Sequence, residues 1–184
     1  MKPIPHTIPE LYKLLEAVPD SFLLKPSPAA SIRRWEKKHD FELAADHREW
    51  LGLVGGCAFK CKLVLYGVAQ TRESNAMIRN DGFPWQIQLG SIRKRLENGD
   101  TLDVSIVPQS SGCHRIVACG WSDPEASCRV IASSFTNLLR LVLLSEWHPR
   151  KKIFSDKETI LAVDPELAKV KGFRKPWEVK FPTF

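Results

Sequence analysis

The spacing of apolar residues changes at Gly55-Gly56, and this change constrains the fold more than any other feature of the chain. Before it, apolar residues recur every three or four positions, as on one face of an amphipathic helix. After it they alternate with polar residues, as in strands with one buried face. Helical spacing returns over residues 135–147. Helices followed by a run of strands and a last helix favour an α+β fold.

The expected elements follow from these patterns. Three helices are predicted: residues 8–18, a second helix beginning near Ala29, and residues 46–53. The alternating segments predict strands over 57–66, 84–89, 101–107, 114–119 and 128–132. Ser133-Ser134 then caps the helix of residues 135–147. Together they predict a single domain with an antiparallel-rich, twisted sheet of about five or six strands and helices packed on one side.

The net charge of +6 is concentrated toward the C-terminus. Residues 148–184 hold nine Lys and Arg against five Asp and Glu, whereas residues 1–147 hold eighteen against sixteen. We therefore expect an α+β domain over residues 1–147 and a basic, aromatic-containing C-terminal extension over residues 148–184. A body this close to neutral is not typical of a uniformly basic nucleic-acid-binding protein.

A series of short motifs, each weak alone, resembles the SUKH superfamily in order and spacing. The superfamily includes yeast cell-wall-synthesis regulators and many bacterial immunity proteins. The motifs are Ile32-x-x-Trp35-Glu36, Leu43-Ala-Ala-Asp46-His-Arg-Glu-Trp50-Leu51, Gly55-Gly56, Leu65-Tyr66-Gly67, Gly99-Asp100-Thr-Leu-Asp103, Val117-Ala-Cys-Gly-Trp121 and Ile131-Ala-Ser-Ser-Phe135-x-x-Leu138-Leu139. The resemblance covers residues 30–145. The chain departs from the family in having Ala44 after Leu43, where Leu-Pro is usual, and in its segment after Trp147.

The resemblance implies a protein-binding scaffold, and its members use one fold for unrelated partners. Read physically, the motif residues form the architecture: Trp35, Trp50 and Phe135 fill the core, and the glycines make turns. The implied function is that of an immunity protein that neutralises a toxin, or of a regulator of the same fold, by stoichiometric binding. Because this chain is basic, we expect the partner to present an acidic patch.

The polar segment of residues 70–85 is the predicted contact surface. Arg72, Arg79 and Trp85 lie there, and Arg and Trp are enriched among residues that dominate binding energy. We therefore predict these three residues as partner-binding.

Cysteine usage and the N-terminal sequence favour a cytoplasmic protein. Five cysteines, an odd number, occur in a chain too large and apolar to need disulfides. No apolar run is long enough to cross a membrane or to serve as a secretory signal. The pairs Cys57-x3-Cys61 and Cys113-x5-Cys119 lack the spacing of zinc knuckles, so we expect buried cysteines and no metal.

The sequence shows no recognisable catalytic constellation. Ser110-Ser-Gly-Cys113-His114 has the residue types of a nucleophile and a base, but no nucleophile-elbow sequence surrounds it. The remaining histidines, His47 among them, are expected to be solvated. Glu97, Asp100 and Asp103 are expected to be turn and strand residues. We therefore expect no enzyme activity and no cofactor; an enzyme of unrecognised type remains an alternative.

A nucleic-acid-binding module is the other alternative. It would use basic residues interleaved with aromatic ones, which can follow a phosphate backbone and stack on bases. The candidates are Arg93-Lys-Arg95 with Trp85, and Arg174, Lys175 and Lys180 with Phe173, Trp177 and Phe181. We favour the interpretation in which Arg93-Lys-Arg95 is a solvated face and the C-terminal aromatics dock on the domain, where they would cover an open sheet edge or an apolar groove.

Overall fold

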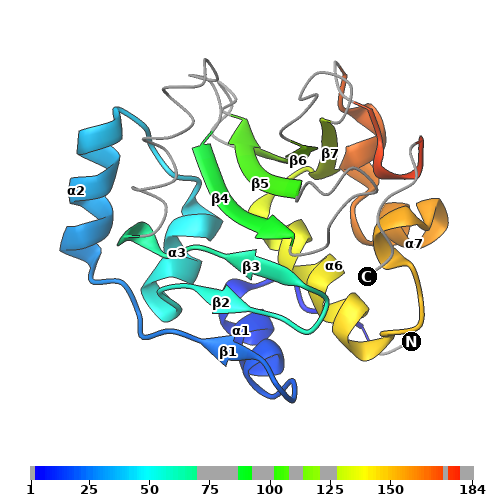
Figure 1. Cartoon of the computed structure of the whole chain (residues 1–184), viewed down its shortest axis with the longest axis horizontal. Helices are drawn as coiled ribbons and strands as arrows, with labels where there is room; N and C mark the ends of the chain where they lie inside the picture. The colour runs from blue at the N-terminus through cyan, green and yellow to red at the C-terminus, as the bar shows by residue number, and fades with distance from the viewer. Residues whose placement is uncertain are drawn as a thin grey trace.

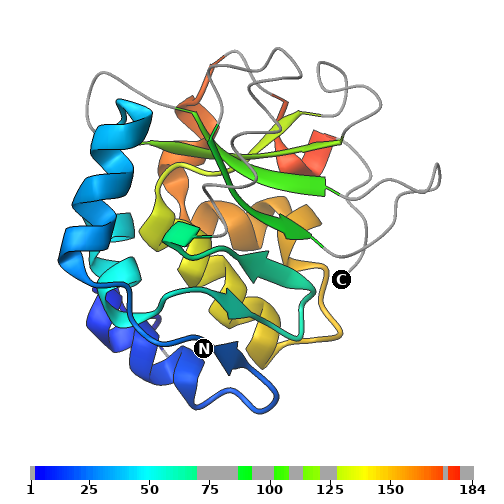
Figure 2. The ribbon, with the colours of Figure 1, turned by 60° about the vertical axis from the view of Figure 1, so that its left-hand side comes forward.

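The chain folds as a layer of helices packed against one antiparallel sheet, as predicted. The structure is a computed structural model and describes residues 3–69, 87–92, 102–107, 114–120, 128–171 and 174–178. Figures 1 and 2 show helix α6 (Phe135–Trp147) running behind the sheet, and in Figure 1 helix α2 (Ala29–His39) lies at the opposite side of the molecule from helix α7 (Lys157–Val163). No described helix is both long enough and apolar enough to span a membrane.

Each predicted N-terminal helix is present. Helix α1 spans Ile8–Glu16 and buries Ile8, Leu11 and Leu15, which lie three or four residues apart. Helix α2 buries Ile32 and Trp35 against the domain and ends at Asp40, which adopts a left-handed conformation. Helix α3 spans Ala45–Leu53 and buries His47, Trp50 and Leu51. Helices α1, α3 and α6 pack against one another.

The sheet is a seven-stranded antiparallel meander in the described residues, slightly larger than predicted. Every strand pairs with its neighbours in sequence, in the order β1 to β7. The strands are β1 (Phe22–Leu23), β2 (Cys57–Ala58), β3 (Leu63–Leu65), β4 (Ile87–Ile92), β5 (Leu102–Val107), β6 (Arg115–Gly120) and β7 (Arg129–Ala132). Register shifts interrupt the pairing between Gln88 and Gly90 and between Ile116 and Val117.

The single strand predicted over residues 57–66 is instead the tight hairpin of β2 and β3. The Lys62 amide donates to the Phe59 carbonyl at 3.0 Å, and Lys62 adopts a φ of 67°. Apolar alternation continues through Phe59 and Cys61 because both side chains are buried, so the pattern does not reveal the turn.

Helix α6 lies at the centre of the core. Ser134 caps it by accepting a hydrogen bond from the Asn137 amide at 3.2 Å, as predicted. Its apolar side chains from Leu138 to Leu144 are fully buried. Asp46, on helix α3, accepts from the Thr136 amide at 2.8 Å and from the Thr136 hydroxyl at 2.9 Å. This carboxylate links the N-termini of α3 and α6, and its negative charge interacts favourably with the positive end of the α6 dipole.

The segment after residue 147 packs on the body. It forms η1 (Ile153–Ser155), α7 (Lys157–Val163), η2 (Pro165–Lys169) and η3 (Pro176–Glu178). Asp164 is fully buried and accepts from the Ser133 amide at 2.7 Å and the Ser133 hydroxyl at 2.6 Å. Arg174 forms a parallel bridge with Arg129 on the outer side of β7, with the Val130 amide donating to the Arg174 carbonyl at 3.1 Å. The C-terminal segment therefore pairs with the last edge of the sheet.

Candidate functional site

The predicted contact residues Arg72, Arg79 and Trp85 lie outside the described residues. The candidate site comes instead from a hollow on the outer side of helices α2 and α3, which sequence reasoning did not predict. Its volume is about 740 Å³, within the range of ligand-binding clefts. We call this hollow the α2–α3 groove; its lining residues are Pro26, Ser27, Pro28, Ala29, Ile32, Arg33, Glu36, Arg48 and Gly52.

Two rows of side chains make the walls of the α2–α3 groove. Ile32 and Glu36 are four residues apart on α2, and Arg48 and Gly52 are four residues apart on α3. Residues with this spacing lie on one face of a helix, one turn apart. The groove therefore follows both helices for at least one turn.

Backbone hydrogen bonds fix the proline-containing end of the groove. The Ser27 amide donates to the Leu51 carbonyl at 2.9 Å, and the Leu24 amide donates to the Gly56 carbonyl at 2.8 Å. Gly55 is required here, because a Cβ at this position would lie 2.0 Å from the Lys25 carbonyl oxygen. Gly56 has a φ of 145°, the conformation expected of a turn glycine, whereas Gly55 does not adopt a positive φ.

The carboxylate of Glu36 joins the two walls. Its Oε1 accepts from Arg48 Nη2 at 2.8 Å, from Arg48 Nε at 3.1 Å and from the Leu43 amide at 2.9 Å. The hydrogen bond to Glu36 raises the pKa of Arg48 further above its ordinary value. The Glu36 side chain is only 14% exposed, so its hydrogen bonds are shielded from water. These bonds connect α2 to α3 and hold the two helices at a fixed distance.

Gly52 leaves the opposite part of the groove open. A Cβ built on Gly52 meets no atom within 4 Å, in contrast to Gly55 three residues later. Gly52 is exposed and has no positive φ, so neither crowding nor backbone conformation calls for glycine there. The signal in the sequence was an isolated glycine inside a helical pattern.

Helix α2 carries four basic residues, of which Arg33 lines the groove. Arg33, Arg34, Lys37 and Lys38 are exposed, and no ion pair with a described residue involves them. The acidic residue of this helix, Glu36, is already bonded to Arg48. The outer face of α2 therefore carries an uncompensated positive charge.

The inner side of the same helix pair is closed. A cavity of only about 10 Å³ lies among Trp35, Leu43, His47, Leu51, Val68 and Ile87, the volume of about one water molecule. Trp35 Nε1 and His47 Nδ1 are buried and have no hydrogen-bond partner among the described residues. This cavity is too small for a substrate or cofactor.

The prediction that His47 is solvated was wrong. The ring is buried and stacks on Phe135, with centroids 4.2 Å apart. Burial lowers the pKa of His47 to about 4, although nearby Asp46 acts in the opposite direction. The residue shares a helix face with Trp50 and Leu51, three and four positions later, which was the signal for burial.

The cysteines are buried, but one pair departs from the prediction. Cys57 and Cys61 are free, and burial raises the pKa of both thiols. Cys119 and Cys128 form a disulfide, so the expectation of a chain without one was wrong. The β6–β7 hairpin register places the two cysteines opposite each other, with Cα atoms 4.1 Å apart, whereas the prediction considered spacing within single strands only.

The described residues do not bring together a catalytic or metal-binding cluster. No group of three His, Cys, Asp or Glu side chains among them could hold a metal ion. His114 is buried, with its Nε2 2.6 Å from the Glu42 carbonyl. Ser110 and Cys113 lie outside the described residues, as do Glu97 and Asp100, and Asp103 is half-buried on β5.

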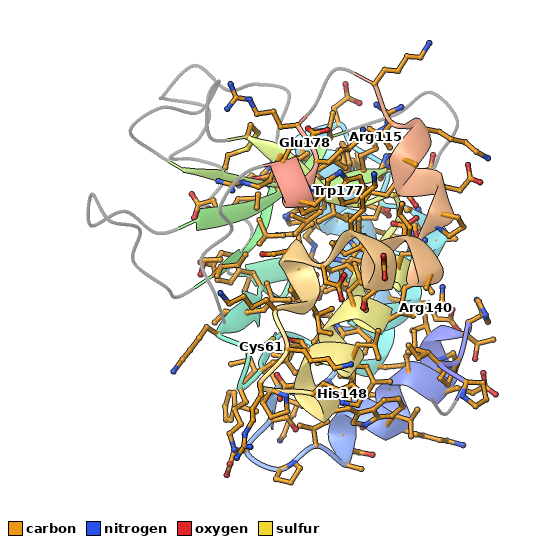
Figure 3. The ribbon with its side chains drawn as sticks, turned by 90° about the vertical axis from the view of Figure 1, so that its right-hand side faces the viewer. Cys61, Arg115, Arg140, His148, Trp177 and Glu178 are labelled. Carbon is orange, nitrogen blue, oxygen red and sulfur yellow. A yellow bond between two sulfur atoms is a disulfide. The ribbon has the colours of Figure 1, made fainter. Side chains whose placement is uncertain are left out.

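Two of the C-terminal basic and aromatic residues, Lys175 and Trp177, pack against the domain. Lys175 is buried and donates through Nζ to the Val170 carbonyl, and burial lowers its pKa. Trp177 packs against the core, with Lys157 Nζ 5.9 Å from its ring centroid. Figure 3 shows Trp177 and Glu178 at the same end of the molecule as Arg115. Arg93-Lys-Arg95, Phe173, Lys180 and Phe181 lie outside the described residues.

No protein-family model and no curated protein matches this sequence. The resemblance to the SUKH superfamily therefore stays a prediction.

Proposed function

We propose that the chain is a non-enzymatic protein-binding domain that acts by stoichiometric binding, as an immunity protein that neutralises a toxin or as a regulator of the same fold. The α2–α3 groove carries this proposal. It is open, has a volume of about 740 Å³, and is held in shape by the Glu36–Arg48 pair and by Ser27. A preformed surface of this kind lowers the entropy lost on binding.

The chemistry of the groove favours a partner with an acidic, partly apolar surface. Pro26, Pro28 and Ala29 supply exposed apolar surface, and Arg33 supplies an exposed positive charge. The partner would cover the groove and the adjoining face of α2, within an interface of roughly 1,600 Å² in total. Binding in this way would inhibit the partner by covering its functional surface.

Protein fits this groove better than nucleic acid does. Nucleic-acid strands bound without sequence preference stack their bases on aromatic side chains. The described lining residues include no aromatic ring, and four of them are proline, alanine or isoleucine.

Affinity capture from the cells that make the protein tests the proposal. The full tagged chain and a variant with Arg33→Glu and Lys37→Glu would be used at low and high salt, and retained protein and nucleic acid would both be quantified. We expect one polypeptide bound one-to-one at high salt and lost from the variant, and the purified pair should re-form the complex. Nucleic acid that elutes as salt rises, with no protein partner, would contradict the proposal.

A further inference from the structure

We propose that Gly52 is the contact point of the α2–α3 groove: it leaves room for an apolar side chain of an acidic partner segment, whose carboxylates bind Arg33. This inference rests on the proposed function and specifies the occupant of the same groove. It assigns Gly52 a role in specificity that the fold does not require.

Gly52 is the second-last residue of α3, in its last turn, where glycine is still not required by the backbone. Glycine in a helix is less favourable than alanine because it loses more backbone freedom on folding. Gly52 has neither of the usual compensations: it lacks a positive φ, and a Cβ there would meet open space. At Gly55, by contrast, the neighbouring backbone excludes every other residue. A glycine that folding does not require is best explained by a requirement for space outside the helix.

The space that Gly52 leaves open belongs to the α2–α3 groove. Gly52 lies one turn beyond Arg48, and both residues line the hollow together with Ile32 and Pro28. Any larger side chain at position 52 would project into this volume. A partner side chain can therefore approach the α3 backbone at Gly52 and contact the exposed apolar surface of Pro26, Pro28 and Ala29.

The charges of the groove indicate an acidic occupant. Its charged lining residues are Arg33, Glu36 and Arg48, and the Glu36 Oε1 already accepts three hydrogen bonds. Arg48 already pairs with Glu36 and, at 3.3 Å, with Glu42, whereas Arg33 is exposed and forms no ion pair with a described residue. Lys37, one turn after Arg33 on α2, adds a further positive charge on the same side. Partner carboxylates beside the apolar anchor would complement this field.

The groove is long enough for a segment and not only for one side chain. Its volume of about 740 Å³ exceeds that of any single residue side chain, and the Pro26–Pro28 end is fixed by the hydrogen bond from Ser27 to Leu51. The occupant is therefore a short acidic segment with at least one apolar anchor, presented by a partner protein.

A displayed library of random 16-residue peptides, selected on the immobilised full chain, tests this occupant. The enriched peptides would be synthesised with a fluorescent label, and their dissociation constants measured by fluorescence polarisation. We expect sequences rich in Asp and Glu that contain a large apolar residue. Their affinity should fall at least about tenfold in Gly52→Leu and in Arg33→Glu, and by less in Gly52→Ala.

Two matched controls separate the groove from general effects. Glu49→Leu places the same large apolar residue on an exposed position of α3 that does not line the groove, and Lys13→Glu makes the same charge reversal on α1. Both should leave peptide affinity unchanged. Thermal unfolding of each variant checks that it is folded.

The outcomes distinguish this inference from the proposed function. Peptides that bind Gly52→Leu as tightly as the unmodified chain, that lack acidic residues, or that fail to be enriched would each overturn the role of Gly52. A protein partner captured from cells that binds Gly52→Leu normally would also overturn it, while leaving the protein-binding function intact. Absence of any protein partner in the capture experiment would instead remove the proposed function.

Discussion

The two sides of the α2–α3 helix pair differ in every physical respect although the same eleven- and nine-residue helices supply both. The inner side is formed by Trp35, His47 and Leu51 and encloses only about 10 Å³. The outer side is formed by Ile32, Arg33 and Gly52 among others and leaves about 740 Å³ open. The comparison teaches that folding determines the inner residues, whereas exposed outer residues such as Arg33 and Gly52 are free to serve a partner.

Replacing Trp50 with alanine should destabilise the protein more than any other change considered for the inner side of the helix pair. The ring is 1% exposed and contacts Tyr12 and Phe135, with ring centroids 6.4 Å and 6.3 Å away. Truncating a buried tryptophan leaves a cavity, so the free energy of unfolding should fall by roughly 3–5 kcal/mol. Urea unfolding measures this decrease in the free energy of unfolding. Glu49→Ala, exposed on the same helix, should change stability by less than about 0.5 kcal/mol; equal effects would contradict the assignment of the two faces.

Acidification should destabilise the inner side through His47. Burial lowers the pKa of His47 from 6.5 to about 4, so the folded state binds fewer protons than the unfolded state between these values. The contribution of His47 to the free energy of unfolding is therefore fully present above pH 6.5. It is lost as the pH falls toward 4, which lowers the free energy of unfolding by up to roughly 3 kcal/mol. The pH dependence of urea unfolding, compared with that of His47→Gln, isolates this contribution. The same slope in both proteins would show that His47 does not titrate as inferred.

Gly52→Ala should have the smallest effect and the opposite sign. Because a Cβ at this position meets open space, the added methyl group introduces no clash, and alanine favours the helix by roughly 0.5–1 kcal/mol. Thermal and urea unfolding should both show a small gain in stability. A loss of stability would mean that the fold requires glycine at position 52, and the contrast between the two sides would weaken.

The sequence predicted the elements of the fold better than their contacts. Helix and strand positions followed from apolar spacing, and the buried Trp35, Trp50 and Phe135 followed from the same patterns. The hairpin within residues 57–66 did not, because its turn depends on Lys62 adopting a left-handed conformation that few non-glycine residues adopt. The two-residue strand β1 is too short to leave a periodic signal.

The candidate site was harder to predict because a groove depends on how two helices are placed. Arg33 is an ordinary surface residue in the sequence, and only its position in the groove with Gly52 gives it a role. The isolated glycine was visible in the sequence, but its meaning depends on a comparison with Gly55, whose Cβ would collide with the Lys25 carbonyl. The predicted contacts Arg72, Arg79 and Trp85 lie outside the described residues and stay a prediction.

The bridge between Arg174 and Arg129 has a consequence for the behaviour of the protein at high concentration. An unpaired edge strand offers amides and carbonyls to the edge of another molecule and promotes aggregation. Here the β7 edge already bonds the C-terminal segment, and the other end of the sheet is the two-residue strand β1. Among the described residues neither end presents a long open strand, so the sheet offers little edge through which one copy of the chain could pair with another.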